Sequence, residues 1–202
     1  FPLNPQVRRY QRDIILSAVQ KNTLVSLPTG LGKTLIAAVL MHNYMTWFPD
    51  RIIIFLAPTK PLVKQQLEAC SRVMGVSSRQ IAEMTGSANV SNRRNLWQTR
   101  SIFFMTPQIL DNDICRGDCP AEKVVLLVVD EAHRAIGRHA IVKSVEQLNH
   151  RVSAGLRILA LTATPGSKLE RIQNVISNLM ISNLEIKNEE DEDIQQHVHN
   201  KE

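Results

Sequence analysis

Short apolar runs rich in Val, Ile and Leu recur along this chain, and longer amphipathic segments separate them. The runs are typical of buried strands, which we predict at 23–27, 52–57, 80–84, 101–105, 124–129, 156–161 and 184–187. The segments between them predict helices at 7–20, 33–46, 60–73, 107–113, 139–149 and 167–179. Strands that alternate with helices predict an α/β fold, in which a doubly wound, mainly parallel sheet has helices on both faces.

A glycine-containing loop joins the first predicted strand to the helix that begins at Lys33. Glycines let backbone N–H groups turn toward a phosphate, and the positive end of the helix adds to the attraction. Lys33 is suited to bind the β- and γ-phosphates, and the Thr34 hydroxyl is suited to bind Mg²⁺. The candidate ATP site therefore comprises Pro28, Thr29, Gly30, Leu31, Gly32, Lys33 and Thr34.

The loop differs from the standard P-loop pattern, which has a glycine where this chain has Leu27. The match is to a shorter variant with Gly-x-Gly-Lys-Thr at its centre. An ordinary strand-to-helix turn is the alternative interpretation, and the strand before the loop and the helix after it favour the P-loop.

Asp130 and Glu131 follow the run at 124–129, which is rich in β-branched residues and typical of a central parallel strand. Open α/β sheets bind their ligands at this end of the strands. Asp130 is therefore a candidate Mg²⁺ ligand, and Glu131 is a candidate base for the attacking water. With Lys33 they form the candidate catalytic set. The alternative is that the two carboxylates cap the next helix.

Hydroxyl residues follow other predicted strands. Thr162 and Thr164 end the strand at 156–161, where they could link hydrolysis to movement or cap the following helix. Three further loops have hydroxyls, N–H groups and one lysine that suit contacts to a sugar–phosphate backbone, although each alone is an ordinary turn. Their candidate DNA-binding residues are Pro58, Thr59, Lys60, Thr85, Gly86, Thr106, Pro107 and Gln108.

The charge of the chain is unevenly distributed. Residues 1–184 contain 22 Lys and Arg against 12 Asp and Glu, whereas residues 185–202 contain 2 against 7. A basic body suits a polyanionic partner such as nucleic acid, although charge spread for solubility is the alternative. We expect a soluble, intracellular protein, because no apolar run approaches the length of a membrane span and no signal-peptide pattern is present. The cysteines Cys70, Cys115 and Cys119 are expected to be reduced thiols.

Taken together and in this order, these motifs resemble the first RecA-like domain of superfamily 2 helicases. They are Gln11, 28–34, 57–63, 85–86, 106–108, the Asp-Glu-Ala-His of 130–133 and the Thr-Ala-Thr of 162–164. The stretches 22–25, 47–49, 67–70, 83–87 and 157–161 further resemble the family of the Fanconi anaemia group M translocase and its archaeal relative Hef.

The resemblance implies an ATP- and Mg²⁺-dependent translocase that remodels branched DNA during repair. It also implies that DNA-repair complex proteins are its partners and that, in a eukaryote, it acts in the nucleus. It implies that Gln11 contacts adenine, against the alternative of a solvent-facing side chain. It also implies that His133, Thr162 and Thr164 couple hydrolysis to DNA movement. We expect a RecA-like domain at 1–187, with a Q-motif-like segment at 1–21, and an acidic linker or the start of a further region at 188–202.

Arginines on a second RecA-like domain complete such motors, so we expect this chain alone to hydrolyse ATP poorly. The other interpretations are a nucleotide-dependent nucleic-acid binding module without turnover and an RNA helicase or sensor of the same superfamily.

Overall fold

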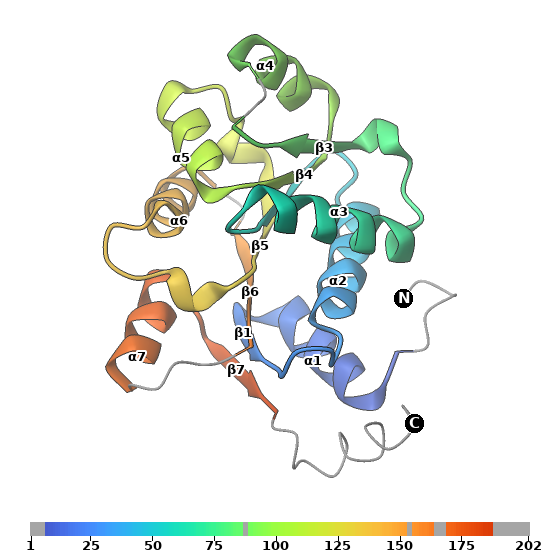
Figure 1. The fold of residues 1–202 in the computed structure, drawn as a ribbon, viewed down its shortest axis with the longest axis vertical. Helices are drawn as coiled ribbons and strands as arrows, with labels where there is room; N and C mark the ends of the chain where they lie inside the picture. Colours follow the sequence, from blue (N-terminus) through green and yellow to red (C-terminus); the bar gives the residue numbers. More distant parts are fainter. Residues whose placement is uncertain (1–6, 87–88, 153–154, 164–168, 188–202) are drawn as a thin grey trace.

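The computed structural model contains a seven-stranded sheet with the strand order β3-β4-β2-β5-β6-β1-β7 (Figure 1). It describes residues 7–86, 89–152, 155–163 and 169–187. The pairings between these neighbours are all parallel, which confirms the predicted fold class. The strands are β1 Thr23–Ser26, β2 Ile52–Leu56, β3 Ile81–Met84, β4 Ile102–Met105, β5 Val124–Val129, β6 Arg157–Thr162 and β7 Asn183–Ile186. All seven predicted strands are present, and none of their ends differs from the prediction by more than one residue.

Helices cover both faces of the sheet, with α1, α2 and α3 on one side and α5, α6 and α7 on the other (Figure 1). The described α-helices are α1 Arg9–Gln20, α2 Lys33–Trp47, α3 Lys60–Met74, α4 Val90–Thr99, α5 Pro107–Arg116, α6 Ala140–Arg151 and α7 Leu169–Asn178. Short 3₁₀ turns occur at η1 Ser78–Gln80, η2 Ala121–Lys123 and η3 Ala132–Arg134. None of the helices in the described part of the chain is long and apolar enough to cross a bilayer.

Two hydrophobic cores lie on the two faces of the sheet. Within β5, Leu126 and Val128 belong to the core under α1–α3, and Leu127 and Val129 belong to the opposite core. Successive side chains of a strand point to opposite faces, so a strand that is buried on both faces must be apolar throughout. This explains why β5 is an unbroken apolar run.

The helix α4 was not predicted, because its sequence between Val90 and Thr99 is mostly polar. A buried carboxylate holds it in place: Asp113 of α5 accepts hydrogen bonds from Arg93 Nε at 3.2 Å and from Trp97 Nε1 at 3.0 Å. Asp113 itself is fully buried. Tertiary contacts of this kind override weak local helix preference.

Candidate functional site

The P-loop lies between β1 and α2, as predicted. Gly30 has φ 86° and Gly32 has φ 89°, a left-handed conformation that glycine adopts without steric cost. Gly32 directly precedes the first residue of α2, Lys33. The free N–H groups at the start of α2 therefore adjoin the glycine turn, in the arrangement that binds phosphate at helix N-termini.

Helix α1 is attached to this loop by two side-chain hydrogen bonds. The carbonyl oxygen of Leu31 accepts hydrogen bonds from Tyr10 Oη at 2.8 Å and from Gln11 Nε2 at 3.1 Å. A Cβ atom at Gly32 would collide with the Gln11 amide, so any other residue there would have to displace the amide from the loop. Gln11 is 3 % exposed, so the alternative of a solvent-facing side chain was wrong. Its predicted contact with adenine stays a prediction.

Lys33 is the first residue of α2, directly after the glycine turn. Its ammonium group donates to the carbonyl oxygens of Leu27 at 2.5 Å and Pro28 at 3.2 Å. Partial burial lowers the pKa of the Lys33 ammonium, while the charges of Asp130 and Glu131 act in the opposite direction. Lys33 and the two carboxylates thus interact electrostatically at the end of the sheet where the glycine turn lies.

Asp130 is 7 % exposed at the end of β5. Its Oδ1 accepts a hydrogen bond from the Glu131 N–H at 3.0 Å. Burial raises the pKa of the Asp130 carboxyl, and that hydrogen bond and the charge of Lys33 partly oppose the effect. A cation bound beside Asp130 would offset the cost of burying its charge.

Glu131 has φ 53°, a left-handed conformation that is uncommon for any residue except glycine. It precedes the short turn η3 without a hydrogen bond from its side chain to the turn, so the capping interpretation is not supported. Such strain is typical of functional positions. The bend directs the Glu131 carboxylate to His133, whose Nδ1 lies 3.2 Å from Glu131 Oε2.

Thr162, at the end of β6, connects the two halves of this site. Its Oγ1 lies 3.3 Å from His133 Nδ1, and its carbonyl oxygen accepts from the Leu27 N–H at 3.2 Å. The strand order explains the position, because β6 pairs with β1 on one side and with β5 on the other. Thr164 lies outside the described residues.

Sequence reasoning missed Gln66, on α3. Thr34 Oγ1 donates to Gln66 Oε1 at 2.9 Å, and Gln66 Nε2 donates to Asp130 Oδ2 at 3.2 Å. The side chain thus bridges the two candidate Mg²⁺ ligands. A polar residue in the middle of an amphipathic helix gives no sequence signal, because its partners are 32 and 64 positions away.

The three candidate DNA loops follow β2, β3 and β4, which are neighbours in the sheet. Since all strands are parallel, these loops leave the sheet at the same edge as the P-loop. Lys60 lies against Gly86, because a Cβ there would be 3.8 Å from Lys60 Cε. Thr59, Lys60, Gly86 and Gln108 are exposed, Pro58 and Thr106 are half-buried, and Thr85 and Pro107 are buried. Thr85 and Pro107 therefore offer little surface to a ligand.

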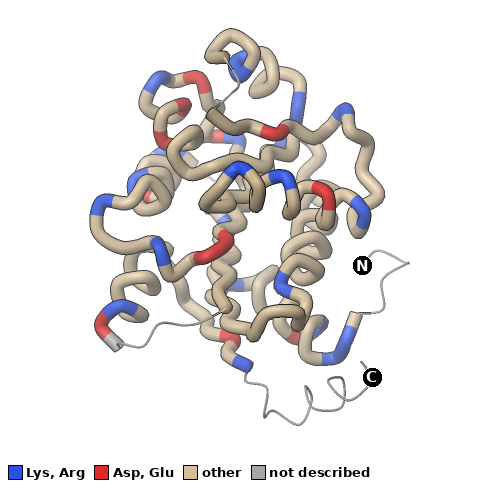
Figure 2. Tube along the Cα trace, in the orientation of Figure 1, with Lys and Arg blue, Asp and Glu red and all other residues tan. Residues whose placement is uncertain are grey.

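Figure 2 shows that Lys and Arg positions are spread over many elements in this view rather than gathered over one of them. The basic charge of the body therefore does not by itself single out a nucleic-acid surface. The arrangement of the three loops is the more specific observation.

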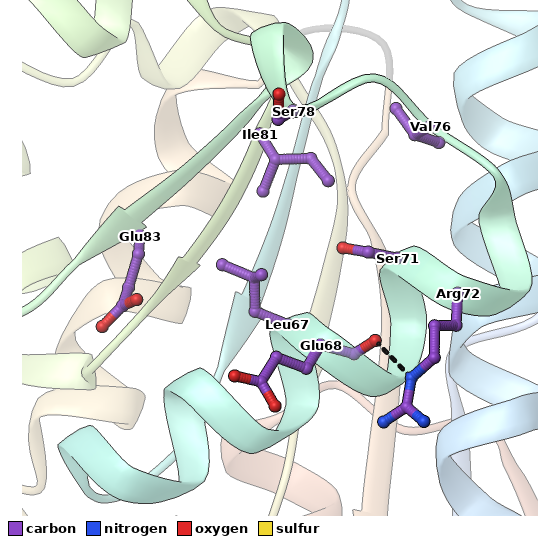
Figure 3. Close-up of a pocket in the computed structure, with 8 residues that line it drawn as sticks. All are labelled: Leu67, Glu68, Ser71, Arg72, Val76, Ser78, Ile81 and Glu83. Carbon is purple, nitrogen blue, oxygen red and sulfur yellow. Dashed lines mark hydrogen bonds between the residues drawn. The ribbon is translucent and has the colours of Figure 1, made fainter.

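A separate pocket of about 550 Å³ lies between α3 and β3. Leu67 and Ile81 point toward each other across it, with Glu68 and Glu83 nearby (Figure 3). Its lining includes none of the predicted ATP- or DNA-binding residues. The pocket is thus distinct from the site at the P-loop.

Taken together, the glycine cradle, Lys33, the buried Asp130 and the neighbouring hydroxyl groups define a nucleotide-binding domain of the P-loop class. The donor set fits ATP with Mg²⁺, because hydroxyl and carboxylate oxygens leave room for phosphate and water ligands. Residues 8–172 match the family described as DEAD/DEAH box helicase, and the chain belongs to that family.

The relatives point to one branch of the family. The chain is 50 % identical over 199 residues to the Fanconi anemia group M protein of Gallus gallus, covering 98 % of this chain and 10 % of the relative. It is 50 % identical over 202 residues to the ATP-dependent DNA helicase fml1 of Schizosaccharomyces pombe, covering 100 % of this chain and 24 % of the relative. The chain therefore spans a quarter or less of these relatives.

A solved structure agrees with this placement. The Hef helicase domain of Pyrococcus furiosus matches with a TM-score of 0.89 and 36 % sequence identity. The match covers 95 % of this chain and 40 % of that one. The chain is thus similar to one part of a longer helicase domain.

Proposed function

We propose that this chain is the ATP-binding part of an ATP-dependent translocase or helicase that acts on branched DNA during repair. The observation that supports it best is the convergence of Lys33, the Asp130–Glu131 pair and Thr162 at one sheet edge, beside three loops suited to a nucleic-acid backbone. Relatives named as a Fanconi anemia group M protein and an ATP-dependent DNA helicase support the choice of DNA. We further infer association with other repair proteins and, in a eukaryote, a nuclear location.

Each residue of the site has a defined part in hydrolysis. The loop N–H groups and Lys33 bind the phosphates, while Thr34 and Asp130 would hold Mg²⁺. When bound, the metal would neutralise the negative charge that develops between the β- and γ-phosphates. Glu131, which lies at the strained bend at the end of β5, is assigned to orient the attacking water and accept its proton. Gln11 is assigned to the adenine.

The contact between His133 and Thr162 provides a route by which hydrolysis affects the rest of the domain. A change at Glu131 alters its 3.2 Å contact with His133, and Thr162 lies 3.3 Å from the same ring nitrogen. Thr162 is in turn bonded to the P-loop strand through Leu27. We assign His133 and Thr162, with Thr164, to the coupling of hydrolysis and DNA movement.

We infer that the 202-residue chain alone hydrolyses ATP slowly. In superfamily 2 motors a second RecA-like domain supplies arginines to the nucleotide, and an arginine finger typically contributes about 10³–10⁵ in rate. A turnover assay with the isolated chain and forked DNA is expected to show weak activity. Full DNA-stimulated hydrolysis by this chain would contradict that inference.

The nucleotide site is tested by binding of fluorescent ADP to wild type, Lys33→Ala and Lys143→Ala. Lys143 is an exposed lysine on α6, which packs on the face of the sheet opposite α2, and it serves as the matched control. Lys33→Ala is expected to weaken binding at least tenfold, and Lys143→Ala is expected to leave it unchanged. Equal affinity of all three proteins would overturn the assignment of the P-loop.

Competition among forked DNA, duplex DNA and duplex RNA for the chain separates the remaining interpretations. Preference for the fork supports the DNA remodeller, whereas preference for RNA supports an RNA helicase or sensor. Binding of DNA that depends on nucleotide, but with no turnover in the longer protein, would support a binding module.

A further inference from the structure

We propose that Gln66 is a positioning residue that holds both protein ligands of the nucleotide-bound Mg²⁺. The inference rests on the proposed ATP site and extends it to a residue outside the P-loop and the Asp-Glu pair. Its basis is the pair of hydrogen bonds that Gln66 makes, from Thr34 Oγ1 to its Oε1 at 2.9 Å and from its Nε2 to Asp130 Oδ2 at 3.2 Å.

The chemistry of the amide fits this role at both ends. A threonine hydroxyl that binds a metal through an oxygen lone pair keeps its proton, and that proton needs an acceptor. Gln66 Oε1 is that acceptor. An ionised carboxylate only accepts, and Gln66 Nε2 is a donor placed against it. The Gln66 carboxamide therefore accepts from Thr34 through its oxygen and donates to Asp130 through its nitrogen. The two hydrogen bonds together fix which side of the amide faces each ligand.

The remaining contacts of Asp130 leave it able to bind the metal. Its second oxygen, Oδ1, accepts from the Glu131 N–H at 3.0 Å. Each carboxylate oxygen has a further lone pair. The two hydrogen bonds thus hold the carboxylate in one orientation, and groups of this kind around metal ligands typically change metal affinity by 10–100-fold when removed.

The bridge is not needed to attach α3 to the core. Val63 and Cys70 lie three positions before and four positions after Gln66, on the same face of the helix. Both are fully buried in the core shared with α2. Apolar packing therefore fixes this face of α3, and the half-buried amide between them is free to serve the metal ligands.

The test compares Gln66→Met with Gln65→Met, because Gln65 is the exposed neighbour on the same helix. The affinity for fluorescent ADP is measured with Mg²⁺ and with EDTA, and thermal unfolding is followed in parallel. Gln66→Met is expected to weaken binding in Mg²⁺ roughly tenfold and to leave binding in EDTA unchanged. Gln65→Met is expected to match wild type in both solutions. Gln66→Asn, which keeps an amide but is too short to span both ligands, is expected to behave like Gln66→Met.

The outcomes separate this inference from the proposed function. If both Gln66 variants bind as tightly as wild type in Mg²⁺, or weaken equally in Mg²⁺ and EDTA, Gln66 does not position the metal ligands. If wild type itself fails to bind ADP in either solution, the proposed ATP site is wrong, and the inference is lost with it.

Discussion

Tyr10 and Leu31 are joined by a hydrogen bond of 2.8 Å from the tyrosine hydroxyl to the carbonyl oxygen of the P-loop. Tyr10 is 2 % exposed on α1, so this bond links the first helix of the domain to the proposed phosphate-binding loop. Gln11 donates to the same oxygen at 3.1 Å. The segment before β1 is thus fixed directly to the proposed nucleotide-binding loop.

Tyr10→Phe is expected to destabilise the domain by about 1 kcal/mol, the usual value of one internal hydrogen bond. Gln11 still donates to the Leu31 carbonyl in that variant, so the loop keeps one of its two bonds. Gln11→Leu is expected to cost more, because its amide also accepts from the Arg8 N–H at 3.0 Å. Urea unfolding and ADP binding of both variants measure the effect. A larger loss in Tyr10→Phe than in Gln11→Leu would contradict this ordering.

Gly32→Ala is expected to abolish tight nucleotide binding, because its Cβ would displace the Gln11 amide. Gly137→Ala is the matched control, since Gly137 also has a positive φ, 57°, but nothing within 4 Å of an added Cβ. Both substitutions are expected to cost about 1–2 kcal/mol in backbone strain. Only Gly32→Ala should weaken ADP binding. Similar ADP affinities for the two variants would show that the clash is unimportant.

Glu131→Asn is expected to stabilise the domain while removing hydrolysis. Asparagine tolerates φ near 53° better than glutamate, and relief of the strain is expected to gain on the order of 1 kcal/mol. For a chain of this length that corresponds to a rise in Tm of roughly 2–4 °C. Glu131→Gln removes the base but keeps an unbranched glutamate-like side chain on the strained backbone. Calorimetry should therefore show a higher Tm for the asparagine variant alone.

Asp113→Ala is expected to destabilise the domain by about 3–5 kcal/mol, because it removes the buried carboxylate that Arg93 and Trp97 share. The loss should be concentrated in α4. Hydrogen exchange of residues 90–99 is the direct measurement, with the distant helix α2 as an internal reference. Uniform loss of protection over both helices would show that Asp113 does not act through α4.

The three thiols should differ in reactivity, because Cys70 and Cys119 are buried and Cys115 is exposed. Burial raises the pKa of the Cys70 thiol to about 12 and also raises that of Cys119. Only the thiolate reacts, so a rise from pH 7 to pH 9 should leave both buried thiols unlabelled by iodoacetamide. Mass spectrometry of the native protein is expected to find label at Cys115 alone, and Cys115→Ser is expected to remove it.

The sequence was sufficient to predict the strands and the main motifs, because these features are local. An apolar run such as β5 must be buried on both faces, and a Gly-Lys-Thr triplet after a strand has few structural alternatives. Parallel strands then bring the motifs to one edge whatever the strand order.

The remainder depends on contacts that no local pattern contains. The helix α4 is held by Asp113, 16 to 20 positions away from its partners. The bridge at Gln66 requires α3 to pack beside both α2 and the end of β5. The left-handed backbone at Glu131 arises where β5 ends and the chain turns into η3, and glutamate gives no sign of it in advance.

The strand order also determines when the phosphate loop can form. The first strand, β1, pairs with β6 and β7, so that Thr23 lies opposite Leu159 and Asn183. Pairings that close such long loops of chain form slowly during folding. During synthesis on a ribosome, β1 would emerge early and would have no partner strand until β6 and β7 had been synthesised. The glycine turn would remain without its flanking sheet until nearly the whole domain had been translated, and ATP could not assist the earlier stages of folding.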